Sequence, residues 1–406
     1  MKLLGLDHYQ CRFRRALKIL LGLSHELMAV VAILSDCQWL RRFLTEYSVL
    51  LQTSEQKRTP IDCLTLSIGL SSGVTVPKME KLMTIPRRTL IDINSTPYYH
   101  CIARCVRRAF LCGVDSLTGN NYEHRKPWVV DRLKELAGIF AIEVCAYAVM
   151  SNHYHVVLHI DTKTGERWSD REVCQRWTQL FVGPLLVQRF LSGDALDKTQ
   201  RQRVTKYAKT YRQRLLDISW FMRCLNEYLA RRANAEDDCK GRFWEGRFKS
   251  QALLDEAAVL SCMAYVDLNP VRAGLVDQPE ASDFTSIQER IRQWQTNRNQ
   301  QAWLKPLKTQ TQFSENCIPF ALSDYFEFVN WTGCAIREDK RGAINSHLPP
   351  ILHRLGIDAD EWLKTMRPNG NRFVRGIGRK KALQVYAEKV RKRWLHGMGA
   401  SQCLFA

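Results

Sequence analysis

The sequence lacks the pairing of cysteines that marks a disulfide scaffold or a common zinc finger. Its 14 cysteines are scattered along 406 residues, and no two of them stand in a C-x-x-C arrangement. A zinc site built from His100, Cys101, Cys105 and Cys112 fits no common finger spacing. We therefore expect most of the thiols to be reduced, buried and inert. A Walker A motif and internal repeats are absent as well.

A long uninterrupted apolar run is also missing. The most apolar stretch, Ile19 to Leu34, is cut by His25 and Glu26 into pieces shorter than the ~20 residues that a spanning helix needs. We find neither a membrane segment nor an export leader, so we expect a cytoplasmic protein. A content of 45% hydrophobic and 25% charged residues excludes wholesale disorder and a low-complexity chain.

Acidic residues are few relative to basic ones. The sequence has 60 Lys and Arg against 41 Asp and Glu, a net charge of +19, which points to a polyanionic partner such as nucleic acid. Residues 201–250 carry 13 basic and 6 acidic residues and end in GRFWEGRFKS, where basic and aromatic residues alternate. This segment is interpreted either as a single-strand contact or as a strand edge with extended arginines. Residues 364–393 hold 11 basic residues and one acidic residue, typical of a DNA-binding region or of a solvated basic face.

Hydrophobic periodicity divides the chain into three parts. Residues 1–82 are interpreted as an N-terminal extension, either an upstream extension of the reading frame or a loosely attached helical arm, because Met83 begins a segment typical of a natural start. Residues 83–280 form the expected main domain, with a helical insertion at 161–240, and residues 283–406 a helical basic accessory region. Within the main domain the pattern predicts strands from Tyr98, over 142–150 and over 153–160, and helices over 128–140, 218–233 and 255–268.

Two histidines on the third predicted strand are the first chemical signal. Residues two apart on a strand point to the same face about 6 to 7 Å apart, so His153 and His155 can meet at one divalent metal. His159 has the same parity but lies ~13 Å beyond His155, too far for a common set of ligands. On the later helix, Tyr265 and Asn269 are four residues apart and share one face. A metal that neutralises a phosphate allows a tyrosine hydroxyl to act as a nucleophile.

Four segments resemble, in order, the HUH superfamily of single-strand DNA endonucleases, and most closely the bacterial REP-associated tyrosine transposases of the single-tyrosine class. They are YYHCIARCVRRAFLCG from Tyr98, AYAVMSNHYHVVLHI from Ala146, GRFWEGRFKS from Gly241 and AYVDLNPVRAGLV from Ala264. The resemblance covers roughly residues 83–280. Each segment alone is only suggestive, whereas the combination of the second and the fourth is highly specific.

The resemblance implies an α+β fold whose antiparallel, ferredoxin-like sheet is covered by helices. It implies that His153 and His155 bind Mg²⁺ or Mn²⁺ and that Tyr265 is the nucleophile. Asn269 stands where related enzymes have a glutamine that completes the metal shell, and it is one methylene shorter. The implied reaction is DNA transposition by transesterification: the tyrosine cleaves single-stranded hairpin DNA and forms a 5′-phosphotyrosyl intermediate, without ATP. The resemblance also implies a bacterial protein acting on nucleoid DNA, and it leaves a homodimer open, since the tyrosine can come from a partner chain.

Further expectations concern phosphate contacts and rival functions. We expect phosphates to be bound by Arg242, Arg247, Lys249 and Arg272. One rival is a catalytically inactive DNA-binding protein that keeps the transposase fold. Another is a metal-dependent hydrolase in which Asp267 or Asp255 activates water, although Asp267 faces away from Tyr265 on a helix. Tyr265 itself has an alternative role as a core residue.

Overall fold

The computed structural model describes residues 91–106, 111–115, 118–296, 303–308, 316–336, 348–367 and 373–405. All of them belong to one compact unit, Lys81–Ala406. The predicted extension over residues 1–82 lies outside the described residues. No helix in the described part of the chain combines the length and the apolar character that a membrane crossing requires.

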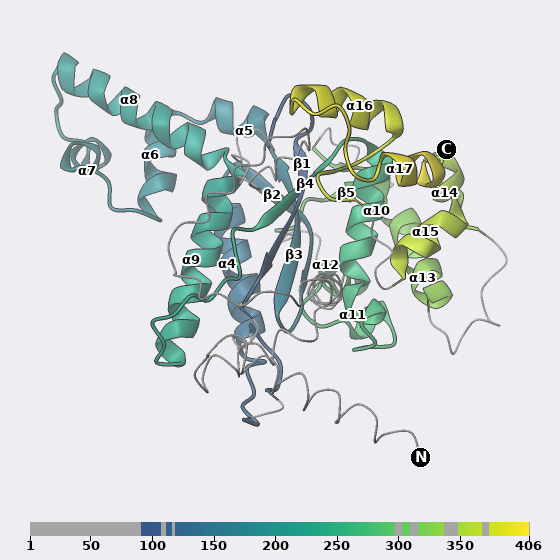
Figure 1. The fold of residues 1–406 in the computed structure, drawn as a ribbon. Helices are drawn as coiled ribbons and strands as arrows, with labels where there is room; N and C mark the ends of the chain where they lie inside the picture. The colour runs from purple at the N-terminus through teal and green to yellow at the C-terminus, as the bar shows by residue number, and fades with distance from the viewer. Residues whose placement is uncertain are drawn as a thin grey trace, which may run out of the picture. The chain divides into compact units, whose positions relative to one another are not determined.

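A five-stranded sheet forms the centre of this unit (Figure 1), with strand order β2-β3-β1-β4-β7. The strands are β1 (Tyr98–Arg104), β2 (Ile142–Val149), β3 (His153–Ile160), β4 (Lys249–Leu253) and β7 (Gly376–Ile377). The β2–β3, β3–β1 and β1–β4 pairs are antiparallel, and β7 joins β4 in parallel. Because β3 lies between β1 and β2, the first three strands and the intervening helix form a split β-α-β unit. This arrangement confirms the predicted α+β class with an antiparallel ferredoxin-like sheet.

The β2–β3 hairpin sets which side chains face which side of the sheet. Ser151 and Asn152 turn the chain, and the backbone N–H of Met150 donates to the carbonyl of His153 at 2.8 Å. Since strand residues alternate between faces, Tyr154 enters one core cluster while Val157 enters the other. Both faces of β3 are therefore covered, and the histidine pair lies on the Val157 side.

Helices α4 (Arg125–Ile139) and α9 (Ile218–Glu236) cover the face of the sheet that holds Tyr154 (Figure 1). Leu133 and Leu136 of α4 are spaced at helical intervals and are fully buried. The helix predicted over 128–140 is thus confirmed, with its beginning three residues earlier than expected. The helix predicted over 218–233 corresponds to α9.

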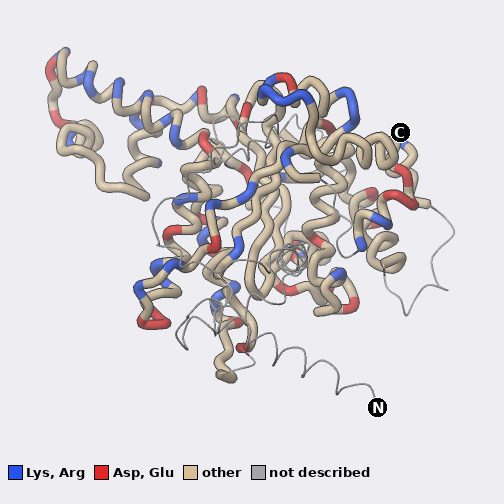
Figure 2. Tube along the Cα trace, in the orientation of Figure 1, with Lys and Arg blue, Asp and Glu red and all other residues tan. Residues whose placement is uncertain are grey.

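Four more helices precede α9 and extend the same core cluster. They are α5 (Thr162–Arg167), α6 (Asp170–Thr178), α7 (Leu185–Ser192) and α8 (Lys198–Leu215). The ring of Trp177 stacks on that of Tyr211 with centroids 5.0 Å apart, which joins α6 to α8. Helix α8 runs away from the sheet, and Lys and Arg follow much of its length (Figures 1 and 2).

The opposite face of the sheet is covered by α10 (Glu256–Asp267), which packs against β2, β3 and β4. The side chain of Asp255 caps this helix by accepting from the backbone N–H of Ala258 at 2.9 Å. Further elements on this side are α11 (Asn269–Arg272), the short 3₁₀ helix η2 (Pro279–Ala281), α12 (Ser286–Gln295) and α13 (Leu322–Ile336).

The C-terminal residues reach both faces and extend the sheet: Ile351 and Trp362 pack into the core cluster on the α10 side, whereas Leu383 and Tyr386 pack into the cluster that holds Tyr154. Their remaining elements are β5 (Leu307–Lys308) paired with β6 (Ile318–Ala321), and the helices α14 (Pro350–Arg354), α15 (Ala359–Met366), α16 (Lys380–Lys389) and α17 (Met398–Leu404). The backbone N–H of Leu254, just after β4, donates to the carbonyl of Ile377 in β7 at 2.9 Å. The segment predicted as a basic accessory region therefore shares backbone hydrogen bonds with the central sheet.

Candidate functional site

The two predicted metal-binding histidines lie together on one face of β3. The rings of His153 and His155 are 4.9 Å apart between centroids and nearly perpendicular. His155 is 5% exposed, whereas His153 at the start of the strand is partly exposed. Tyr154 points to the opposite face, where its hydroxyl donates to Oδ1 of Asn226 at 2.6 Å. Strand alternation thus brings the histidines together and removes the intervening tyrosine from the site.

Both imidazoles are held in the neutral form. Burial and, to a smaller extent, the nearby Arg104 guanidinium lower the pKa of His153 to about 4. Burial also lowers the pKa of His155 well below its usual value, with His100, His153 and Arg272 acting in the same direction. At neutral pH each ring therefore carries one proton and one free lone pair, which is the form that ligates a metal.

A third histidine, which the sequence did not single out for this site, lies beside the pair. His100 on β1 is 1% exposed, and its ring stacks on that of His155 at 5.1 Å. Nε2 of His100 lies 2.8 Å from Nδ1 of His155, and Nδ1 of His100 lies 2.7 Å from Oε1 of Gln251 on β4. These contacts come from three neighbouring strands, so only the strand register reveals them.

Tyr265 on α10 faces this histidine cluster. Its ring centroid is 6.2 Å from that of His155, and its side chain is partly buried at the edge of the second core cluster. The Arg272 guanidinium lies over the Tyr265 ring at 4.2 Å, close enough for a cation–π interaction. Nε of Arg272 also donates to the carbonyl of Met366 at 2.6 Å, which holds the cation in place. Tyr265 and Arg272, two predicted site residues, are therefore in contact with each other.

Asn269 is related to Tyr265 less simply than the sequence predicted. Helix α10 ends at Asp267, and Asn269 begins the separate four-residue helix α11, so the two residues lie on successive helices rather than on one. Asn269 is 7% exposed, and its Nδ2 atom has no hydrogen-bond partner among the residues that the structure describes. Since an amide nitrogen and oxygen are distinguished only by their partners, this unsatisfied position suits an acceptor as well as a donor.

The side chains around His153 and His155 offer few ligands to a divalent metal. In the described part of the chain, no three His, Cys, Asp or Glu side chains gather as a metal-binding set. Two neutral imidazoles on one face and the unsatisfied amide of Asn269 are compatible with a site that water and substrate oxygens complete. The zinc alternative does not fit, because Cys101 lies on the opposite face of β1 from His100 and is buried in the first core cluster.

The two carboxylates of the hydrolase alternative serve structural roles. Asp267 is fully buried, and it accepts from the hydroxyls of Ser286 and Tyr325 and from the backbone N–H of Ile287. Burial raises its pKa to about 6, although these hydrogen bonds act in the opposite direction. Asp255 caps α10 and also accepts from the backbone N–H of Arg379 at 2.6 Å. Neither carboxylate is free to activate water beside the histidines.

The basic residues predicted to bind phosphates differ in whether their side chains are exposed or already hydrogen-bonded within the protein. Arg242 donates from Nε to the carbonyl of Trp244 at 2.8 Å and so closes its own loop. Arg247 and Lys249 are exposed, and Lys249 pairs with Ile102 in the sheet, which places it on the histidine face. Arg104, which the sequence analysis did not name, pairs with His153 in the register and is also exposed.

His159 lies at the far end of β3, as its spacing predicted, and it has a structural partner. Its Nδ1 is 2.8 Å from Oε2 of Glu143, which also accepts from Nζ of Lys305 at 2.6 Å. Burial opposes the charged form of Glu143, yet the hydrogen bonds from His159 and Lys305 lower its pKa below the usual value. This cluster joins β2 and β3 to the segment before β5 and is separate from the His153–His155 pair.

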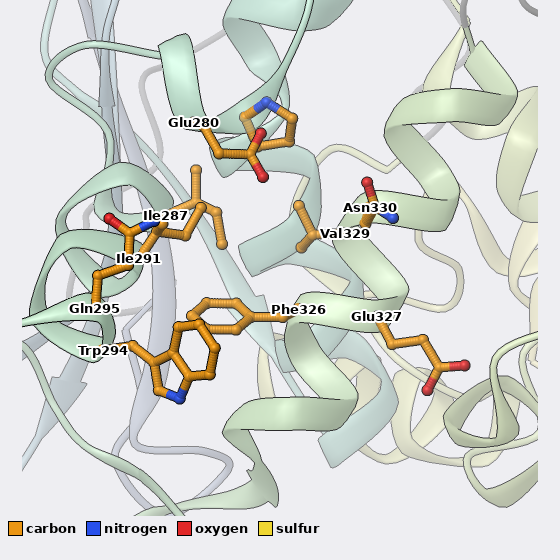
Figure 3. A pocket seen from close by; sticks show the side chains of 10 residues that line it. Glu280, Ile287, Ile291, Trp294, Gln295, Phe326, Glu327, Val329 and Asn330 are labelled. Atoms are coloured by element: carbon orange, nitrogen blue, oxygen red, sulfur yellow. The ribbon is translucent and has the colours of Figure 1, made fainter.

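A hollow outside the histidine site lies between α12 and α13 (Figure 3). Figure 3 shows Trp294 and Phe326 close together in it, with the carboxylates of Glu280 and Glu327 at its sides. Its lining residues include no Lys or Arg, so the hollow does not suit a phosphate-bearing ligand.

Comparisons with known proteins give limited information. No family model matches the sequence, and no curated protein matches it. One solved structure with some likeness is described as "Structure of the REP associates tyrosine transposase bound to a REP hairpin". Its sequence is 13% identical to this one, and the likeness covers 59% of this chain and 99% of the transposase chain, with a TM-score of 0.28. A likeness at that level carries no argument, so the functional case rests on this chain's own residues.

Proposed function

We propose that this protein is a single-tyrosine transposase that cleaves and rejoins single-stranded hairpin DNA. The observation that carries the proposal is the meeting of His153 and His155 on β3 with Tyr265 on α10, the two histidine rings 4.9 Å apart and the tyrosine ring 6.2 Å from that of His155. A neutral histidine pair beside a partly buried tyrosine under an arginine suits metal-assisted attack on a phosphodiester.

The proposed chemistry is a transesterification at one phosphorus atom. The Tyr265 hydroxyl oxygen forms a bond to phosphorus, and the bond from phosphorus to the 3′ oxygen breaks. The phenol loses its proton, and the departing 3′ oxygen gains a proton. The products are a 5′-phosphotyrosyl adduct and a free 3′-hydroxyl. The number of phosphoester bonds is unchanged, so the reverse reaction reseals a strand without ATP.

In this proposal His153 and His155 hold Mg²⁺ or Mn²⁺ through Nε2, and the Asn269 amide is a candidate third ligand. When bound, the metal would neutralise the target phosphate and polarise its oxygens. Arg272 positions the Tyr265 ring through its cation–π contact, and the same cation adds positive charge beside the attacked phosphate. The metal-ligand roles are those that the resemblance implies, the role of Arg272 comes from its contact with the Tyr265 ring, and both are compatible with the contacts described above.

The proposed substrate is single-stranded DNA that folds into a hairpin. Exposed cations on the histidine face, Arg104 and Lys249, and the exposed Arg247 nearby in sequence are suited to its phosphates. The net charge of +19 favours such a partner at long range. A homodimer in which Tyr265 acts on DNA bound by the partner chain stays among the proposed arrangements.

The decisive experiment compares the protein with its Tyr265→Phe variant on labelled hairpin DNA from the flanks of its own gene, with Mn²⁺ and denaturing electrophoresis. We expect a metal-dependent covalent protein–DNA band that is lost in Tyr265→Phe. The matched control is Tyr207→Phe, which removes an exposed hydroxyl on α8 (37% exposed) and should leave the band unchanged.

A second outcome would favour the alternative function. If hairpin DNA binds but no adduct or nick appears with Mg²⁺ or Mn²⁺, the protein is a DNA-binding module that retains the transposase fold. If nicks form equally in Tyr265→Phe, a water-activating hydrolase is indicated and the tyrosine mechanism fails.

A further inference from the structure

A chain of three hydrogen bonds leads from the C-terminal region to the histidine pair. Nε2 of Gln251 donates to the backbone carbonyl of Phe373 at 2.6 Å, and its Oε1 lies 2.7 Å from Nδ1 of His100. Nε2 of His100 lies 2.8 Å from Nδ1 of His155. Gln251, His100 and His155 are 6%, 1% and 5% exposed, so water does not compete for these contacts.

The carbonyl of Phe373 determines how the Gln251 amide is oriented. If the amide were turned over, its oxygen would face the carbonyl oxygen of Phe373, two acceptors at 2.6 Å with no proton between them. The amide oxygen must therefore face His100, and Nδ1 of His100 must carry the proton that it accepts. A buried neutral imidazole has one N–H, so Nε2 of His100 is an acceptor.

The same reasoning then places the proton on His155. The nitrogens of His100 and His155 are 2.8 Å apart and share one proton, which must be on Nδ1 of His155. Its Nε2 is then a bare lone pair, and no described residue forms a hydrogen bond with it. Nδ1 of His153 lies 2.7 Å from Oδ1 of Asn152, a contact that suits the same tautomer.

We propose that Gln251 and His100 are positioning residues that hold His155 as its Nδ1–H tautomer, so that Nε2 is left unprotonated as a preformed ligand for a divalent metal. This inference rests on the proposed function in one respect, the use of that metal in DNA cleavage. The tautomer itself is a property of the metal-free protein. Outer partners of this kind commonly change metal affinity about 10- to 100-fold when they are removed.

The first test uses the unaltered, full-length, metal-free protein labelled with ¹⁵N-histidine. Long-range ¹H–¹⁵N correlation spectra distinguish a protonated from an unprotonated ring nitrogen, and the His155→Gln spectrum identifies the signals of His155. We expect Nδ1 of His155 to be protonated and Nε2 unprotonated at pH 7.5. A protonated Nε2 with a bare Nδ1 would overturn the proposal.

The second test measures Mn²⁺ binding directly, by the loss of the free-ion electron paramagnetic resonance signal. Gln251→Leu removes the acceptor that orients His100, and we expect Mn²⁺ binding to weaken on the order of 10-fold or more. The matched control, Gln288→Leu, removes a buried amide that bonds to Glu280 and Asp283, outside the histidine site, and should leave Mn²⁺ binding unchanged. Equal affinity in Gln251→Leu and the unaltered protein would refute the positioning role.

The two proposals fail in different ways. If the tautomer is as expected and Gln251→Leu weakens Mn²⁺ binding, but no Tyr265 adduct forms on hairpin DNA, the positioning role of Gln251 and His100 stands and the transposase function is wrong. If the adduct forms but His155 carries its proton on Nε2, the transposase function stands and the positioning role is wrong. Hairpin binding in the presence of EDTA should be the same in Gln251→Leu as in the unaltered protein, because Gln251 and His100 act only on the metal ligand His155.

Discussion

The buried carboxylate of Asp267 provides the sharpest test of how the site is supported. Asp267 lies two residues after Tyr265 and joins α10 to α12 and α13 through Ser286, Ile287 and Tyr325. Replacing it with alanine leaves three donors without an acceptor in a fully buried place. Each such donor costs about 1 to 3 kcal/mol, so the gross loss is about 6 kcal/mol at the middle of that range.

Part of this loss is offset, because the carboxylate itself is costly to bury. Burial raises the pKa of Asp267 from 3.8 to about 6. A shift of that size corresponds to roughly 3 kcal/mol against the charged form at neutral pH. The expected net effect of Asp267→Ala is therefore a loss of roughly 3 kcal/mol, or a fall of roughly 5 °C in the melting temperature of a unit of this size.

Asp267→Asn is the matched variant, because it keeps an acceptor oxygen and removes the charge. We expect its stability to be within about 1 kcal/mol of the unaltered protein, and its Tyr265 adduct to form normally. Differential scanning calorimetry at pH 7.5 and the adduct assay measure the two effects. An unchanged melting temperature in Asp267→Ala would refute the structural argument, and loss of cleavage in a stable Asp267→Asn would instead support the hydrolase alternative.

Three further predictions use other contacts. Hydrogen bonds lower the pKa of Glu143, so this carboxylate stabilises the fold above its unfolded pKa, and the stabilisation is lost as pH falls through the folded pKa. Glu143→Gln should therefore make the melting temperature depend less on pH between pH 6 and 3. A pH profile equal to that of the unaltered protein would contradict the assignment. Arg247→Ala should lower the dependence of log affinity on log salt by about 0.7 on single-stranded hairpin loops, whereas an equal slope would exclude a phosphate contact. Tyr154→Phe removes the buried hydrogen bond to Asn226 and should cost about 1 kcal/mol in chemical unfolding, with adduct formation unchanged; a lost adduct would mean that this tyrosine also takes part in catalysis.

Much of the fold was predictable because its strands and helices have strong local periodicity. The alternation around His153 and His155 placed both histidines on one face before any contact was known, and the apolar spacing over 128–140 and 255–268 located α4 and α10. The segments that resemble the transposases directed attention to Tyr265. That Arg272 lies over its ring is a contact that needed the structure, although both residues had been selected from the sequence.

Other parts of the site were not predictable, for reasons that are also local. The chain leaves α10 at Asp267, so the spacing of Tyr265 and Asn269 did not describe a single helix. Of the four arginines and lysines selected as phosphate contacts, Arg242 is occupied by its own loop. Whether a basic side chain is free depends on carbonyls that surround it in space, which composition does not report.

Features that depend on near neighbours along the chain were predictable from the sequence: the hairpin, the helices, the positive charge and the parity of the two histidines. Contacts that depend on strand register and on distant segments became visible in the folded chain. His100 reaches His155 across 55 positions, and Gln251 reaches the carbonyl of Phe373 across 122. Hydrogen bonds between such distant residues follow from the way strands pair and sheets are covered, so the proton on His155 is a property of the folded chain.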